Sequence, residues 1–277
     1  MTAVTVANPS PPVRPVVRVS VAQVASTEDH EANRRAAVEA IAAAAASHAD
    51  LVVLPEYSSA FTPAGVGLEL AEPVDGPFVT TLREHAASTG VAVVAGTALP
   101  GAGRASNVIV AVDAHGDLVG QYHKVHLYDA FGSRESDHLE PGPADAPPLV
   151  FDVHGLRFGV MTCYDLRFPE SARRLVDAGA QVLLVPAAWA SGPLKVEHFT
   201  TLATARAIEN TAIVVGVGLA GPGVIGHSLA VGPDGVVGAA LDGDPGFATV
   251  DLDPEQVTAV RGRNPSLANR RYRVVPA

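Results

Sequence analysis

The sequence predicts an α/β protein built as a four-layer αββα sandwich. Its expected strands are nearly continuous apolar runs, which is typical of sheets that are covered on both faces. The sequence predicts about a dozen strands and only four or five helices, a proportion that fits two packed sheets with helices outside each. Strand–helix–strand units also alternate with hairpins, so parallel and antiparallel pairing are both expected. Periodicity alone leaves a single large sheet open.

The first hundred or so residues predict alternating strands and helices. Residues 16–24 are rich in β-branched side chains and follow prolines, which favours a strand. Residues 31–47 are rich in alanine with a dense apolar face, which favours a helix packed on a sheet. The later elements expected in this part are a strand at 51–54, a helix at 77–88 that opens on a proline and closes at Gly90, and a strand at 91–99.

From Asn107 onward the pattern changes to hairpins with single helices between them. Short turn sequences such as Asp113-Ala114-His115-Gly116 separate runs of alternating or continuous apolar residues. The expected hairpins join 108–112 to 118–124, 150–153 to 156–162, and 228–231 to 236–241. The other expected elements are helices at 168–178 and 194–210 and strands at 182–185, 212–217 and 247–252.

The chain of 277 residues is long enough to bury a large core, and no Ser/Gly-rich linker or charge run divides it. We therefore expect one folded domain over residues 15–260. Residues 1–14, with three prolines among small polar residues, are expected to form a flexible tail. Residues 261–277 are expected to form a C-terminal arm that reaches an oligomer interface.

Charge and cysteine content limit the partners and the compartment. The formal net charge is −10, so the long-range field repels nucleic acid and anionic membrane surfaces. Apolar stretches fall far short of the roughly 20 residues that a membrane helix needs. A single cysteine excludes an intrachain disulfide, and no signal peptide is evident at the N-terminus. These features predict a cytoplasmic protein that binds neither nucleic acid nor membranes.

Three reactive side chains follow expected strands directly. Glu56 comes after an apolar run, Lys124 ends the second strand of a hairpin, and Cys163 ends the apolar run 158–162. Taken singly, a free cysteine is more often an inert core residue, and a lone Glu or Lys at a strand end is often a structural ion pair or a solvated cap. A carboxylate, an ammonium and a thiol in one repeated pattern instead favour thiol-based acyl transfer.

Several blocks of the sequence, taken in order, match one known family pattern. They are Leu54-Pro55-Glu56, residues 122–129 (YHKVHLYD), residues 134–136 before Pro141-Gly142, residues 159–170 (GVMTCYDLRFPE), residues 189–210, Gly226-His227-Ser228 and Asn269-Arg270-Arg271. Together they resemble the nitrilase superfamily of carbon–nitrogen hydrolases from about Val16 to Arg273. The run CYDLRFPE is similar to the branch that includes ω-amidases and deaminated-glutathione amidases, whereas true nitrilases usually carry Cys-Trp-Glu.

The resemblance implies a Glu-Lys-Cys catalytic triad. Carried over residue by residue, Cys163 is the nucleophile, Glu56 the general base and Lys124 an oxyanion stabiliser, with Glu135 as an auxiliary acid group. A thiol is only a few per cent ionised near neutrality, so a nearby base and cation both promote its attack. Glu135 is expected to hydrogen-bond either Lys124 or the substrate amide.

The same resemblance suggests where a substrate binds. Tyr164 follows the nucleophile, so its backbone N–H is a candidate oxyanion donor, and Trp189 opens a later family block. Arg167 and Arg134 are candidate clamps for an acidic substrate, because guanidinium groups bind carboxylates in a bidentate manner. The family pattern also implies a homodimer or a higher homo-oligomer.

The resulting expectation is hydrolysis of a small carboxamide by water, through a cysteine thioester, to a carboxylate and ammonia. An N-carbamoyl amino acid hydrolase or a nitrilase with the same triad is the nearest alternative. A catalytically silent binding scaffold is an alternative from another class. A Cys–His dyad also stays open, because ten histidines are available.

Two other motifs carry less weight, and neither a cofactor nor a metal is expected. Residues 216–221 fit G-x-G-x-x-G after a strand, but Pro222-Gly223 follows and no helix opens there to bind a phosphate. His123 and His126 are three residues apart in a strand-to-loop stretch without a carboxylate or thiol in a recognised metal-ligand spacing.

Overall fold

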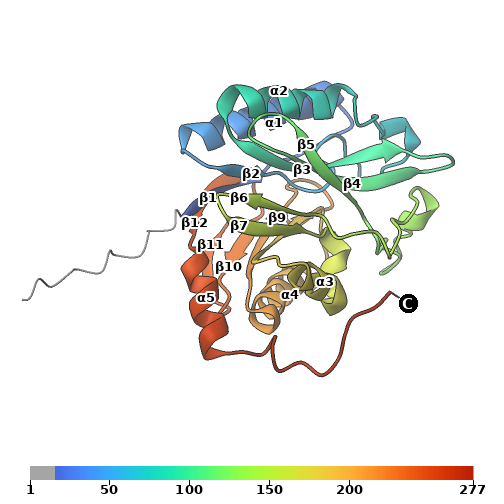
Figure 1. Cartoon of the computed structure of the whole chain (residues 1–277). Coiled ribbons are helices and arrows are strands. Elements are labelled where there is room, and N and C mark those ends of the chain that lie inside the picture. Colours follow the sequence, from blue (N-terminus) through green and yellow to red (C-terminus); the bar gives the residue numbers. More distant parts are fainter. Residues whose placement is uncertain (1–15, 277) are drawn as a thin grey trace, which may run out of the picture.

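The computed structural model describes residues 16–276. It contains two sheets of six strands each, stacked face to face (Figure 1). The first sheet has the order β12 (Gly246–Leu252), β1 (Val17–Gln23), β2 (Leu51–Val53), β3 (Ala92–Pro100), β4 (Ala105–Val112) and β5 (Leu118–His123). The second has the order β11 (Val237–Ala240), β10 (Leu229–Val231), β9 (Ile213–Gly218), β8 (Val182–Ala187), β7 (Leu156–Val160) and β6 (Val150–Val153).

Helices cover the outer face of each sheet, which confirms the predicted αββα layers. Figure 1 shows α1 and α2 over the first sheet and α3 and α4 against the second. The helices are α1 (His30–Ala46), α2 (Pro77–Thr89), α3 (Pro169–Asp177), α4 (Lys195–Asn210) and α5 (Pro254–Arg263). Short 3₁₀ turns occur at η1 (Leu68–Leu70), η2 (Glu135–Asp137) and η3 (Cys163–Arg167).

The continuous apolar runs of the sequence are explained by burial on both sides of each sheet. In β2, Leu51 and Val53 face the core between the sheets, while Val52 faces the core beneath α1 and α2. All three side chains are fully buried. Because successive residues of a strand point to opposite faces, a strand in an inner layer needs apolar residues at every position.

Parallel pairing is concentrated where the site is built. The strands β1, β2 and β3 pair in parallel in one sheet, and β7, β8 and β9 do so in the other. Antiparallel hairpins extend both sheets toward β5 and β6. The loops that leave β2, β5, β7 and β8 carry the predicted reactive residues or their neighbours, so the sheet pairing brings distant sequence positions together.

The C-terminal region differs from the sequence expectation, which placed no helix after residue 252. Helix α5 begins after Asp253, whose side chain accepts a hydrogen bond from the Glu255 N–H at 2.8 Å. Residues 264–276 then run back along the molecule, and Arg270 pairs with Asp177 of α3 at 2.6 Å. The predicted role of the arm at an oligomer interface stays a prediction, and the predicted tail at 1–14 lies outside the described residues. No helix within residues 16–276 combines the length and apolarity needed to cross a membrane.

Candidate active site

Glu56 lies directly after β2, in a position that the neighbouring strand fixes closely. The Gly96 N–H of β3 donates to the Pro55 carbonyl at 3.0 Å. A Cβ atom added at Gly96 would lie 2.5 Å from the Glu56 Cα and 2.6 Å from the Tyr57 nitrogen. Only glycine therefore allows β3 to approach this closely, and that approach sets the backbone of Glu56.

Lys124 follows β5 and extends into the interior between two carboxylates. Its backbone N–H donates to the Asn107 carbonyl at 2.9 Å. Its Nζ lies 2.9 Å from Glu56 Oε1 and 2.8 Å from Glu135 Oε2. The Lys124 and Glu56 side chains are each only 1% exposed. Burial of an ammonium at this depth is tolerated because two anions offset its lost hydration.

Two further groups hold the Glu56 carboxylate, and the sequence analysis missed both. The Asn107 side-chain amide donates to Oε1 and the Ala188 backbone N–H donates to Oε2, each at 2.6 Å. Asn107 is a polar residue inside the apolar strand β4 and is 1% exposed. That placement is a signal that could have identified it, because buried amides are normally committed to a specific partner.

Cys163 begins the η3 turn with a left-handed backbone, at a φ of 45°. A capping box between Thr162 and Asp165 holds the turn, and the Thr162 hydroxyl also donates to the Pro186 carbonyl. Asp165 is fully buried and accepts from the Tyr122 hydroxyl at 2.7 Å. A positive φ is rare for residues other than glycine, and such residues are found most often at functional sites. The predicted change from buried strand to turn and helix is confirmed.

Glu135 joins the group from the loop after Lys124. The Tyr57 hydroxyl donates to its Oε1 at 2.6 Å, and the Tyr128 backbone N–H donates to its Oε2 at 2.7 Å. Of the two predicted partners, Lys124 is therefore in contact with Glu135. Burial alone would raise the pKa of Glu135, but Lys124 and these donors outweigh it and lower that pKa below 4.5.

The electrostatics keep the thiol protonated while the lysine is charged. Burial raises the pKa of Cys163 well above 9.0, and the Glu56 carboxylate raises it further, against the lowering effect of Lys124. Burial disfavours the charged form of Lys124, but Glu135 and Glu56 outweigh this and raise the pKa of Lys124 well above 10.5. The resting thiol therefore needs a base at the moment of attack.

The reactive groups line an inner cavity of about 50 Å³. Its lining residues are Glu56, Tyr57, Lys124, Tyr128, Glu135, Cys163, Tyr164, Ala188, Trp189, Ala190 and Lys195. The predicted residues Tyr164 and Trp189 thus lie beside the thiol. An outer cavity of about 590 Å³ shares Tyr57, Tyr128 and Glu135 with it. The inner volume suits a small functional group, and the shared residues place the outer cavity next to it.

The two predicted arginine clamps lie outside the inner cavity. Arg134 lines the outer cavity, but it is 73% exposed and lies 3.5 Å from Asp137. The Arg167 guanidinium packs behind the inner wall, 4.9 Å from the Trp189 ring centroid and 5.5 Å from that of Phe131. Lys195, which the sequence analysis did not select, reaches the inner cavity instead.

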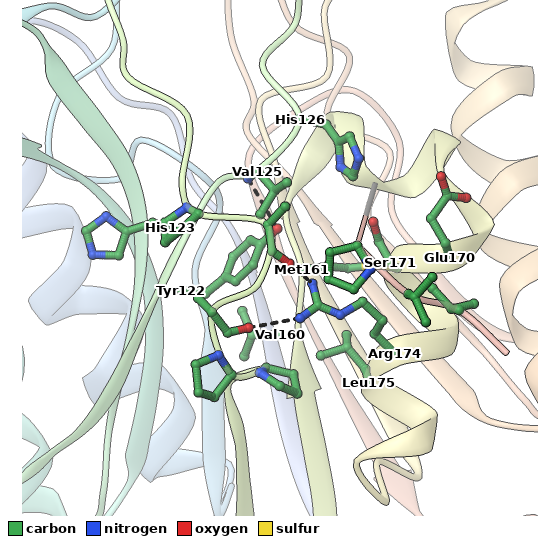
Figure 2. A pocket seen from close by; sticks show the side chains of 18 of the residues that line it. Tyr122, His123, Val125, His126, Val160, Met161, Glu170, Ser171, Arg174 and Leu175 are labelled. Carbon is green, nitrogen blue, oxygen red and sulfur yellow. Dashed lines mark hydrogen bonds between the residues drawn. The ribbon is translucent and has the colours of Figure 1, made fainter.

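A third cavity, of about 260 Å³, lies on another part of the molecule (Figure 2). His123 and His126 both line it, but their rings lie on different sides of it, and His126 Nδ1 is 2.7 Å from Asp165 Oδ1. Arg174 donates to the Ala144 and Ala146 carbonyls there. Within residues 16–276, no cluster of three or more His, Cys, Asp or Glu side chains is arranged to hold a metal ion.

The G-x-G-x-x-G motif lies at the end of β9 and in the turn after it, and no helix follows. A Cβ at Gly218 would overlap the Gly226 backbone. Gly218 therefore allows close packing of these two backbone segments.

Comparison with known proteins places the chain in a family. Residues 18–262 match the family model described as carbon-nitrogen hydrolase. A protein of Escherichia coli O157:H7 named deaminated glutathione amidase is 38% identical, over 92% of this chain and 97% of its own length. A hydrolase of Mycobacterium tuberculosis is 37% identical, over 92% of this chain and 95% of its own.

Solved structures extend the likeness to the fold. A CN-hydrolase superfamily protein from Xanthomonas campestris superposes with a TM-score of 0.82 at 25% identity, covering 94% of this chain and 99% of that one. A nitrilase-superfamily amidase from Nesterenkonia AN1, in a cysteine variant, gives a TM-score of 0.76 at 29% identity, covering 93% and 98%. Another variant of that amidase carries acrylamide added to its active-site cysteine, with a TM-score of 0.75 at 29% identity, covering 91% and 98%. The chain belongs to the carbon–nitrogen hydrolase family, within the nitrilase superfamily.

Proposed function

We propose that the protein hydrolyses a small carboxamide to a carboxylate and ammonia through a thioester on Cys163. The observation that carries the proposal is the position of Glu56, which lines the inner cavity together with Cys163 and lies 2.9 Å from the Lys124 Nζ. A base beside the nucleophile, next to a fixed cation, is the arrangement that acyl transfer requires. The names of relatives such as deaminated glutathione amidase support an amide substrate.

In the first half of the reaction the Cys163 sulfur attacks the amide carbon and Glu56 takes the thiol proton. The raised pKa of Cys163 makes this transfer necessary, because little free thiolate exists near neutrality. Lys124 and the Tyr164 backbone N–H stabilise the oxyanion, a type of contact worth about 3–4 kcal/mol per donor. Glu56 then gives the proton to the departing nitrogen, the C–N bond breaks, and ammonia leaves an acyl thioester.

In the second half Glu56 takes a proton from water, and the resulting hydroxide attacks the thioester carbon. The C–S bond breaks, the sulfur regains a proton from Glu56, and the carboxylic acid leaves. Glu135 holds Lys124 in place in both halves through its contact with Nζ at 2.8 Å. The small inner cavity limits the water that can compete during the first half.

The test is a steady-state comparison of amide, N-carbamoyl and nitrile substrates, with the acyl-enzyme detected by intact mass. Wild type should release ammonia from amides and gain the mass of one acyl group at Cys163. Cys163→Ala should do neither, and Glu39→Gln, a change at an exposed glutamate on α1, should behave as wild type. Turnover of nitriles or N-carbamoyl compounds alone would contradict the amidase proposal, and no turnover with an unreactive thiol would favour a silent scaffold.

We also propose that the protein forms a homodimer or a higher homo-oligomer in the cytoplasm. Exposed apolar side chains support assembly: Ile208 on α4 is 47% exposed, and Tyr272 and Val275 of the C-terminal segment are 91% and 73% exposed. Sedimentation at micromolar concentration should give a mass above that of one chain. A purely monomeric protein would refute the assembly.

A further inference from the structure

One buried carboxylate joins the segment around Lys124 to the segment around Cys163. Asp165 lies two residues after Cys163 and is fully buried. The Tyr122 hydroxyl donates to its Oδ2 at 2.7 Å, and His126 Nδ1 lies 2.7 Å from its Oδ1. Tyr122 and His126 stand two residues before and two residues after Lys124. A single carboxylate therefore binds both sides of the segment that carries the ammonium.

The same carboxylate holds the turn that presents the thiol. The Thr162 backbone N–H donates to Asp165 Oδ2 at 3.0 Å, within the capping box that begins the η3 turn. Cys163 has a left-handed φ of 45°, and such a conformation persists only where the surrounding structure holds it. Asp165 Oδ2 thus accepts one hydrogen bond from the turn of the thiol and another from Tyr122, in the strand that leads to the ammonium.

Both side-chain donors to Asp165 are fixed in one orientation. Burial, and then the Asp165 carboxylate, raise the pKa of Tyr122 well above 10.0, so its hydroxyl keeps its proton and donates. A carboxylate only accepts hydrogen bonds, so His126 Nδ1 carries the hydrogen in its contact. The His126 ring stacks on Phe168 with 3.7 Å between the ring centroids, which fixes the ring plane. A shift of either segment would therefore leave a buried carboxylate without a donor, which is costly.

We propose that Asp165 is a positioning residue that sets the distance between the Lys124 ammonium and the Cys163 thiol. It acts through Tyr122 and His126, which flank Lys124. The inference rests on the proposed function, in which the ammonium and the thiol act on one carbonyl group. Tyr122 and His126 line the third cavity rather than the inner one (Figure 2). They therefore affect the reaction without touching a substrate beside the thiol.

Tyr122→Phe tests the proposal by removing a single hydroxyl. The variant loses the link from β5 to Asp165 but keeps the capping box of the turn and every side chain that lines the inner cavity. Because the ammonium must meet the developing oxyanion, a displacement of about 1 Å should lower kcat for amide hydrolysis by about 10- to 100-fold. KM should change by less than about threefold, because the loss is confined to the transition state.

His126 offers a conservative pair of variants, and the C-terminal segment offers a matched control. His126→Asn keeps an N–H donor near the place of Nδ1 and should retain most of the wild-type kcat. His126→Leu removes the donor and should lower kcat as Tyr122→Phe does. Tyr272→Phe removes a hydroxyl from a side chain that is 91% exposed and should behave as wild type. Equal loss in His126→Asn and His126→Leu would mean that the ring packing on Phe168, rather than the bond to Asp165, is what matters. That result would overturn the proposal.

Alkylation of Cys163 by iodoacetamide, followed by intact mass at several pH values, separates positioning from loosening and needs no amide turnover. Burial raises the pKa of Cys163 most, and Lys124 opposes it. If Lys124 moves away from the thiol in Tyr122→Phe, the midpoint of alkylation should move to higher pH. If the turn merely opens, loss of burial should move the midpoint to lower pH.

The two readouts distinguish failure of this inference from failure of the proposed function. An alkylation midpoint at or below that of wild type in Tyr122→Phe would overturn the positioning role, as would a kcat within threefold of wild type. If wild type hydrolyses no amide while Tyr122→Phe still shifts the midpoint upward, the proposed function is refuted and the link between the two segments stands.

Discussion

Lys124 Nζ lies 2.9 Å from Glu56 Oε1, and each of these side chains is 1% exposed. With Glu135 on its other side, Lys124 is one cation held between two anions in a nearly dry interior. The surplus negative charge acts on the adjacent thiol, because an anion near sulfur opposes its ionisation. The raised pKa of Cys163 supports the proposed role of Glu56 as its proton acceptor.

Glu56→Gln should lower the pKa of Cys163 while abolishing amide hydrolysis. Burial raises this pKa most, and the Glu56 and Glu135 carboxylates raise it further, so loss of the Glu56 carboxylate removes one of these causes while Lys124 still favours the thiolate. Ultraviolet absorbance of the thiolate, followed against pH, should move to lower pH than in wild type. Glu39→Gln is the matched control. An unchanged midpoint would mean that Glu56 does not act on the sulfur.

Lys124→Met should destabilise the protein by about 3–5 kcal/mol, because it leaves two buried carboxylates without their cation. The free energy of unfolding from urea titration measures this effect. Arg35→Gln breaks an exposed pair with Glu31 and should cost only about 0–0.5 kcal/mol. Similar values for the two variants would contradict the buried network.

Glu135 should make stability depend on pH in acid. Its pKa is lowered below 4.5 in the folded protein, so its contribution is fully present above 4.5 and is lost as pH falls through the lower folded value. Urea midpoints measured downward from pH 5 should fall more steeply for wild type than for Glu135→Gln. Parallel curves would show that Glu135 titrates alike in the folded and unfolded chains.

Gly96→Ala should reduce amide turnover, whereas a glycine replacement at an open position should not. The new Cβ would lie 2.5 Å from the Glu56 Cα, so β3 or Glu56 must shift. A displacement of about 1 Å in a reacting group can cost about 10²-fold in rate. Gly262→Ala is the control, since nothing lies within 4 Å of its added Cβ in α5. That change should leave activity intact and stabilise the helix by about 0.5–1 kcal/mol. Equal activity in both variants would show that β3 does not set the position of Glu56.

Strands with continuous apolar sequences were predicted well, and the missed helix α5 has an identifiable cause. Strands such as β2 and β8 are buried on both faces, so their composition is unambiguous. Helix α5 was missed because it packs only a few apolar residues, Val257 and Val260 among them, although Asp253 and Pro254 form a normal helix start. The surface against which α5 packs is formed by residues that come together only when the chain folds.

The sequence by itself predicted the layer architecture, because nearly continuous apolar strands need sheets that are covered on both faces. Its resemblance to the nitrilase superfamily predicted the chemical character of the site. Only the tertiary structure decided which side chains meet. Asn107, Ala188 and Lys195 belong to the site through sheet pairing and a helix start far from Cys163 in sequence. The protonation of the thiol was decided in the same way, since burial and the distance between charges exist only after the chain has folded.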